Sequence, residues 1–174
     1  MKWFLAIGAS AQIVSATCLA AAPAREAWFY KKTNSARWCS FVTKASAEAA
    51  SKGDDFDPEE SGWLRNAKGV GLSVLETLQS QDAFVEDTYT FGPNLLVTQL
   101  VRRGHYVDDP MIRAVFKPDA RGRLRMTAES RKGLKNANRA TYFLEWPTHS
   151  KFSSFPFARL VRTHPQVTVF NGCR

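Results

Sequence analysis

The sequence predicts an α+β fold, with a largely antiparallel β-sheet of about six strands and one or two short helices near its N-terminal end. Segments rich in aromatic and β-branched residues follow one another from residue 83 onward and are separated by turn residues. No helical pattern connects these segments, which argues against a parallel α/β fold. Two helical patterns occur earlier, within residues 43–69. A small closed or half-closed β-barrel is the alternative architecture.

The first 24 residues have the features of a secretory signal peptide. Lys2 supplies a positive charge, an apolar stretch occupies residues 3–22, and small residues follow it. We expect cleavage after Ala24, because cleavage after Ala22 would leave a proline at the first mature position. Residues 25–174 would then form a single globular domain, secreted or periplasmic, with no transmembrane segment. An uncleaved membrane anchor is the alternative, since the apolar stretch is just long enough to span a bilayer.

Two of the three cysteines remain after signal removal. Cys18 leaves with the signal, whereas Cys39 and Cys173 lie near the two ends of the mature chain. Exported proteins fold in an oxidising compartment, so these two cysteines are expected to pair. The bond would close a loop of about 135 residues and contribute roughly 5 kcal/mol in the chain-entropy model. Two isolated cysteines cannot complete a zinc site, and no metal or other cofactor is expected.

The N-terminal third of the mature chain combines extended and helical patterns. Residues 25–42 carry aromatic and β-branched side chains typical of strands. Residues 43–52 are rich in alanine and are followed by Gly53, which predicts a short helix. The segment Asp57-Pro58-Glu59-Glu60 resembles a capping box with proline at the first helical position, and predicts a second helix. That helix would end near Gly69 and bury three residues: Trp63, Leu64 and Ala67.

The remaining chain is read mainly as strands and turns. Residues 70–81 are ambiguous, because the apolar residues first alternate and then continue at helical spacing. Residues 117–122 contain proline, aspartate and glycine and predict a hairpin connection. The predicted strands of this part are residues 83–91, 95–101, 111–116, 123–128, 141–146 and 166–170.

The charge is concentrated in two segments of opposite sign. The chain has 24 Lys and Arg against 16 Asp and Glu, a formal charge of +8, which becomes +7 when Lys2 is removed. Residues 48–60 hold six acids and one lysine, a net charge of −5. Residues 117–139 hold eight bases and two acids, a net charge of +6. This distribution predicts a polarised surface, or an internal pairing of the two segments, and makes nucleic acid an unlikely partner.

Three arginines of the basic segment alternate along a predicted strand. Alternation places Arg121, Arg123 and Arg125 on one face, with Leu124 and Met126 on the other face, toward the core. Adjacent guanidinium groups repel one another, so a bound anion would stabilise them. An edge strand protected by its charges is the alternative. The predicted anion-binding residues are Arg121, Arg123, Arg125, Arg131, Lys132 and Lys135.

The densest cluster of possible catalytic groups lies around residue 105. His105 with Asp108 or Asp109 could act as an acid–base pair. Arg102 and Arg103 could then hold an anionic substrate. The simpler interpretation is a turn between strands, where glycine, aspartate and proline are common. The two other histidines, His149 and His164, stand next to or near prolines and are expected in loops.

These observations favour a non-enzymatic function. We expect an exported soluble domain that binds an anionic envelope component or a protein partner through residues 121–139. One alternative is a small secreted hydrolase of a phosphorylated or acidic polymer, with His105 as the acid–base group. Another is a structural envelope subunit with an apolar surface around residues 152–157.

Overall fold

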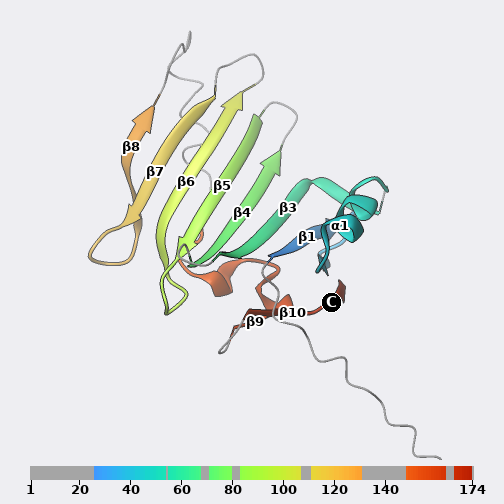
Figure 1. Ribbon diagram of the computed structural model, residues 1–174. Helices are drawn as coiled ribbons and strands as arrows, with labels where there is room; N and C mark the ends of the chain where they lie inside the picture. Colours follow the sequence, from blue (N-terminus) through green and yellow to red (C-terminus); the bar gives the residue numbers. More distant parts are fainter. Residues whose placement is uncertain are drawn as a thin grey trace, which may run out of the picture.

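Nine strands form one antiparallel sheet in the computed structural model, in the order β11-β2-β1-β3-β4-β5-β6-β7-β8 (Figure 1). The structure describes residues 26–53, 55–67, 71–79, 83–106, 111–130, 148–163 and 167–173. The strands of this sheet are β1 (Glu26–Lys32), β2 (Trp38–Phe41), β3 (Phe56–Ala67), β4 (Gly71–Gln79), β5 (Ala83–Phe91), β6 (Val97–Tyr106), β7 (Ile112–Pro118), β8 (Leu124–Ser130) and β11 (Gly172–Cys173). The predicted antiparallel sheet is confirmed, but about six strands was too few.

The sheet is open, so the alternative of a β-barrel is wrong. Its two ends are β11 and β8, which lie at opposite ends of the strand order. A separate two-stranded sheet joins β9 (Val161–Thr163) and β10 (Val167–Val169). The short helices are α1 (Lys44–Ser51), η2 (Phe152–Ser154) and η3 (Ala158–Leu160).

Only one of the two predicted N-terminal helices forms. The alanine-rich segment is α1, whose N-cap residue Thr43 accepts a hydrogen bond from the Ser46 amide at 3.2 Å. The second predicted helix is wrong, since the same residues form strand β3 between β1 and β4. The backbone alternates there, with Leu64 buried and Arg65 exposed, and cross-strand pairing overrides the local helix-start signal.

The core lies on one face of the sheet, which we call the inner face. Alternate residues of β4 and β5 are buried, and this settles the ambiguous residues 70–81 in favour of a strand. The C-terminal segment 148–163 covers part of the inner face, and its aromatic side chains belong to the same apolar cluster as those of the sheet. The aromatic run at residues 152–157 is therefore mainly core rather than an exposed apolar patch.

Gly62 allows this segment to approach the sheet closely. Phe157 lies over Phe29, with ring centroids 4.4 Å apart. A Cβ atom on Gly62 would lie 2.7 Å from Phe157 Cε1, well inside van der Waals contact. Glycine at this position of β3 is therefore required by the packing of Phe157.

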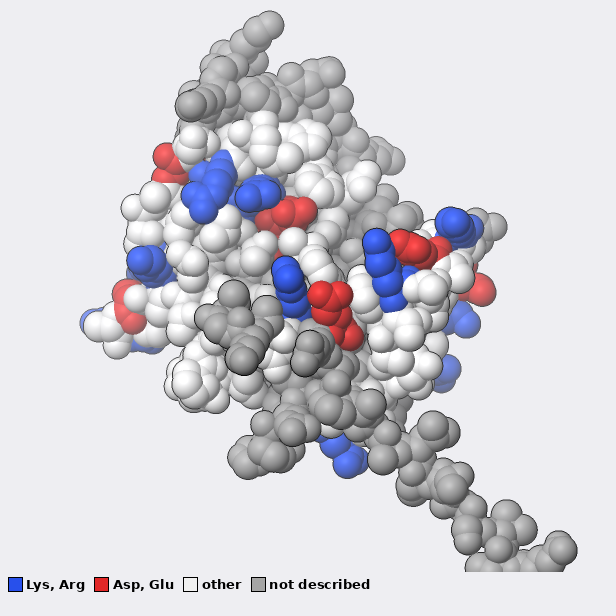
Figure 2. All heavy atoms as spheres, viewed as in Figure 1, with Lys and Arg blue, Asp and Glu red and all other residues white. Residues whose placement is uncertain are grey.

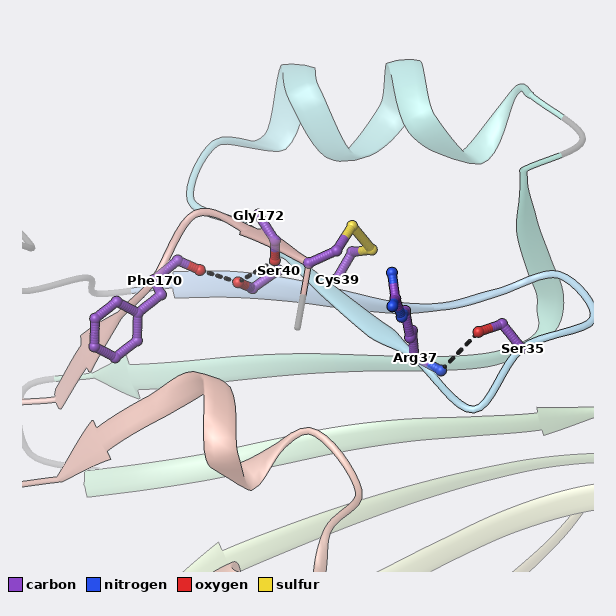
Figure 3. The surroundings of a disulfide bond; sticks show 7 residues. Ser35, Arg37, Cys39, Ser40, Phe170 and Gly172 are labelled. Atoms are coloured by element: carbon purple, nitrogen blue, oxygen red, sulfur yellow. Dashed lines mark hydrogen bonds between the residues drawn. A yellow bond between two sulfur atoms is a disulfide. The ribbon is translucent and has the colours of Figure 1, made fainter.

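The predicted disulfide is confirmed and joins two adjacent strands. Cys39 on β2 is bonded to Cys173 on β11, and their Cα atoms are 4.0 Å apart. Figure 3 shows the next residue, Ser40, pointing toward the chain around Phe170 and Gly172. Its hydroxyl donates a hydrogen bond to the Phe170 carbonyl oxygen, and the Gly172 carbonyl oxygen lies 3.3 Å from the same hydroxyl. The disulfide and these contacts fix the C-terminal end of the described chain to strand β2, near the N-terminal end of the described chain.

No helix in the described part of the chain is both long enough and apolar enough to cross a membrane. The predicted signal peptide, its cleavage site after Ala24 and Cys18 lie outside the described residues. Export and the domain boundary at residue 25 therefore stay predictions.

Candidate functional site

The predicted basic strand divides into a turn and an edge strand. The hairpin between β7 and β8 forms as predicted, but Arg121 lies within its turn and Arg123 precedes β8. Of the three alternating arginines, only Arg125 belongs to the strand. The prediction that all three share one strand face is therefore wrong, because Gly122, at φ +74°, reverses the chain between the first two.

β8 is the edge strand of the sheet, and most of it is exposed. Leu124 packs against the core as predicted, whereas Met126, which was also predicted to be core, is 47% exposed. The register with β7 shifts near Thr127, which is an irregularity typical of protected edges. β8 therefore has the features of an edge strand protected by charged side chains, which is the alternative interpretation given above. Arg125 is one of those charged side chains.

The acidic and basic segments do not pair within the described residues. β3 and β8 are separated by four strands, which corresponds to about 24 Å between their axes. Instead, acids of residues 48–60 form ion pairs with lysines of neighbouring elements or of the same helix. Glu60 pairs with Lys31 on β1, and Glu48 pairs with Lys44 on α1. The described part of the basic segment is therefore not a dock for these acids, and residues 131–139 lie outside the described residues.

Asp119 organises the turn between β7 and β8. Its Oδ1 accepts hydrogen bonds from the amides of Arg121 at 2.8 Å and Arg123 at 3.0 Å. Its Oδ2 lies 3.5 Å from Arg123 Nε and 3.4 Å from Arg125 Nε. The bond from the Arg123 amide, with those from Arg121 and Arg125, holds the pKa of the Asp119 carboxyl below its ordinary value.

Cationic side chains also face one another across β6, β7 and β8. Arg103 lies directly opposite Arg113, and Lys117 lies directly opposite Arg125. The two pairs lie on the outer face of the sheet, away from the core. Figure 2 shows basic and acidic side chains interspersed on the side of the molecule that carries these strands. We call these four residues the basic face. Arg131, Lys132 and Lys135 lie outside the described residues.

The predicted catalytic residues are not brought together by the described structure. His105 lies half-buried on the outer face of β6, with its ring 5.7 Å from that of Phe84. Arg103 shares that face, but Arg102 points to the inner face and is fully buried. Asp108 and Asp109 lie outside the described residues, as does His164. The two arginines therefore do not form a common anion clamp.

Sequence reasoning missed a buried polar row on the inner face. Glu76, Asp87 and Arg102 lie side by side on β4, β5 and β6, and all three are buried. Arg102 binds Asp87 at two points, and the Tyr89 hydroxyl donates to Asp87 Oδ2 at 3.1 Å. The sequence contains a signal for this row, because each of the three charged residues occupies a core-facing position in a strand whose other core-facing residues are mainly apolar.

The environment of this row shifts the pKa of Tyr89 and of Arg102. Burial, together with the negative charges of Asp87 and Glu76, raises the pKa of the Tyr89 hydroxyl above its ordinary range. Burial lowers the pKa of Arg102, but the hydrogen bonds and charge of Asp87 outweigh this and raise it overall. Tyr89 is therefore a neutral donor and Arg102 a fixed cation.

His149 links the covering segment to this polar row. Its Nε2 lies 3.5 Å from Glu76 Oε1, and its Nδ1 lies 3.0 Å from Ser154 Oγ. The Ser154 hydroxyl donates to the Lys151 carbonyl at 2.6 Å, so it accepts from Nδ1–H. Both ring nitrogens thus face protein groups, and Ser154 is already a donor to the backbone. This serine–histidine–glutamate arrangement holds the segment in place rather than presenting an activated nucleophile.

Among the described residues, no three His, Cys, Asp or Glu side chains are arranged to hold a metal ion. A shallow cavity of about 260 Å³ lies where the β5–β6 turn meets the C-terminal segment 148–163, and Leu95 and Phe152 line it.

Comparison with known proteins finds no matching family model, no similar curated protein and no similar solved structure. The functional argument therefore depends on the geometry of this chain alone.

Proposed function

We propose that this protein is an exported, non-enzymatic domain that binds an anionic component of the cell envelope through its basic face. One observation carries the proposal, namely that Arg103 opposes Arg113 and Lys117 opposes Arg125. Like charges directly opposite each other destabilise a sheet. An anion bound between them would convert this repulsion into attraction.

The acids nearby do not neutralise the basic face. Glu86 lies 4.0 Å from Arg103, and Asp119 contacts Arg125. Within the part of the chain that the structure describes, Arg113 and Lys117 form no ion pair. Each opposed pair therefore keeps one uncompensated positive charge on an exposed surface.

Binding is better supported than acid–base catalysis. His105 packs against Phe84, while Arg102 belongs to the opposite face of the sheet. The ring nitrogens of His149 are engaged by Glu76 and Ser154. A general acid or base needs a nitrogen within reach of substrate, and these contacts leave none on His149.

The experiment measures binding of purified mature protein to inorganic phosphate, to vesicles containing an anionic phospholipid and to an acidic polysaccharide. Binding to at least one probe is expected at low salt, and it should weaken as salt increases. The variant Arg113→Gln/Lys117→Gln should lose about tenfold in affinity, the effect of about 1.4 kcal/mol.

The matched control is Arg37→Gln/Lys52→Gln, which removes two exposed positive charges far from the basic face. It should bind nearly as well as the unmodified protein. A second variant, with Arg121, Arg123 and Arg125 all changed to Gln, tests whether the turn between β7 and β8 contributes to anion binding. The proposal fails if no probe binds at low salt, or if the control variant loses as much affinity as Arg113→Gln/Lys117→Gln.

A further inference from the structure

We propose that the ligand of the basic face is a linear acidic polysaccharide that lies along β7 on the outer face of the sheet. This inference rests on the function proposed above, and it names the class of ligand. The basic face has two separate cationic positions. The row of side chains midway between them carries no charge, and hydroxyl and amide groups lie beyond it on β5 and β6.

The spacing of the two cationic positions requires an extended anion. Arg113 and Lys117 are four residues apart on β7 and point to the same face. At the rise of an antiparallel strand, they are separated by about 13 Å. A single phosphate or carboxylate touches one position only. A chain with repeated negative charges contacts both, and the second contact then benefits from a high effective concentration.

The surface between the two positions carries no charge. Val101 and Val115 lie opposite each other on β6 and β7, midway between the two basic pairs. The next residue in the same row is Thr88 on β5. A ligand lying along β7 would cross this row midway between the two basic pairs, where the described residues place no carboxylate.

Hydroxyl and amide side chains continue this surface beyond the basic face. Thr88 and Thr90 on β5 and Gln99 on β6 share the outer face and are half-buried. Their side chains make no hydrogen bond within the described part of the chain. Such groups both donate and accept, and they therefore match the ring hydroxyls of a sugar.

Other polyanions fit this surface less well. Single-stranded nucleic acid binds with bases stacked on exposed aromatic rings. Phe84 and His105, near Arg103, are half-buried and in contact with each other, and the Trp28–Trp63 stack lies about 19 Å from β7, on β1 and β3. Insertion into a membrane needs a contiguous apolar patch. The exposed large apolar residues of the described chain are isolated on four different segments: Val42, Leu96, Met111 and Met126.

The test is a binding series with oligogalacturonates of increasing length, using the mature protein and calorimetry. Affinity should rise at least tenfold once the oligomer is long enough to span both cationic positions. Arg113→Gln alone and Lys117→Gln alone should each abolish this length-dependent gain, whereas Arg37→Gln should not. Methyl-esterified oligomers, which lack the charges, should bind at least tenfold more weakly.

Several results would overturn the inference. A flat dependence on length, or equal binding of the methyl-esterified oligomers, contradicts the two-point contact. Equally tight, length-dependent binding of polyglutamate contradicts the assignment to a sugar. If vesicles or inorganic phosphate bind through the basic face while oligogalacturonate does not, the proposed function stands and this inference fails. If no anionic probe binds, both fail.

Discussion

Asp87 and Arg102 lie directly opposite each other on β5 and β6 and form a two-point ion pair in the core. The distances are 2.7 Å from Arg102 Nε to Asp87 Oδ1 and 2.6 Å from Nη2 to Oδ2. Neither side chain is more than 1% exposed. In such surroundings, the cost of losing one partner greatly exceeds the net value of the pair, because the other charge is left buried and unpaired.

Replacing Asp87 alone should destabilise the protein strongly. We expect Asp87→Leu to lower the free energy of unfolding by about 3–5 kcal/mol, since Arg102 would keep its charge without its partner. Urea denaturation followed by tryptophan fluorescence measures this. The double variant Asp87→Leu/Arg102→Met should recover most of the loss. Arg103→Met, on the exposed face of the same strand, should change stability by less than about 0.5 kcal/mol. A double variant no better than Asp87→Leu would contradict the unpaired-charge explanation.

Adding one methyl group at Gly62 should be costly. Gly62→Ala places a carbon 2.7 Å from Phe157 Cε1, so the Phe157 ring must move away from Phe29. Overpacking of this kind costs about 1–3 kcal/mol, and thermal unfolding should show a lower midpoint. Phe157→Leu in the same chain should relieve the clash, and the two changes together should cost less than the sum of the separate effects. Simple additivity would argue against this contact.

Trp63 carries a buried donor with no acceptor, and this predicts an unusual mutant. Its Nε1 is the buried side-chain polar atom without a hydrogen-bond partner among the described residues. Trp63→Phe removes that donor and keeps an aromatic ring beside Trp28, so the free energy of unfolding should stay within about 1 kcal/mol of its original value. Trp63→Ala should cost more, because the ring contact is lost as well. Equal losses in the two variants would show that the indole N–H has a partner in solution.

The turn at Asp119 should respond to acid. Its carboxyl pKa is lowered in the folded chain, so the stabilisation is present above the ordinary carboxyl range and is lost as pH falls through the lowered value. Amide NMR shifts of Arg121 and Arg123 should therefore stay constant down to pH values below about 3.9, the ordinary aspartate value, and change beneath it. Asp119→Asn should abolish this response. A transition at or above the ordinary value would contradict the hydrogen-bonded turn.

The antiparallel sheet and the disulfide were predictable because their signals are local or compositional. Alternation marked several of the strands, and the predicted signal peptide left two cysteines with one way to pair. The second helix failed for a physical reason. Asp57-Pro58 is a strong local helix start, yet the register between β1 and β3 shifts between Tyr30 and Lys32, next to residues 57–59. Proline is tolerated in a strand at such an irregularity.

The candidate site was only partly predictable. The charge pattern located a basic hairpin, but sequence alone did not show that Arg103 on β6 would stand opposite Arg113 on β7. That relationship depends on register, which is set by the pairing of whole strands. The buried pair Asp87–Arg102 was missed for a different reason. Its arginine was assigned to a surface cluster with Arg103, although adjacent residues of a strand point to opposite faces.

The place of β11 in the sheet has a consequence for the order of biosynthesis. Among the described strands, β11 is the last to be synthesised, yet it pairs with β2, the second in chain order. The bond of Cys39 to Cys173 therefore cannot form until its partner, 134 residues later, has been translated. This bond can form only after residue 173 has been added, so it distinguishes chains that contain residue 173 from shorter or C-terminally clipped ones.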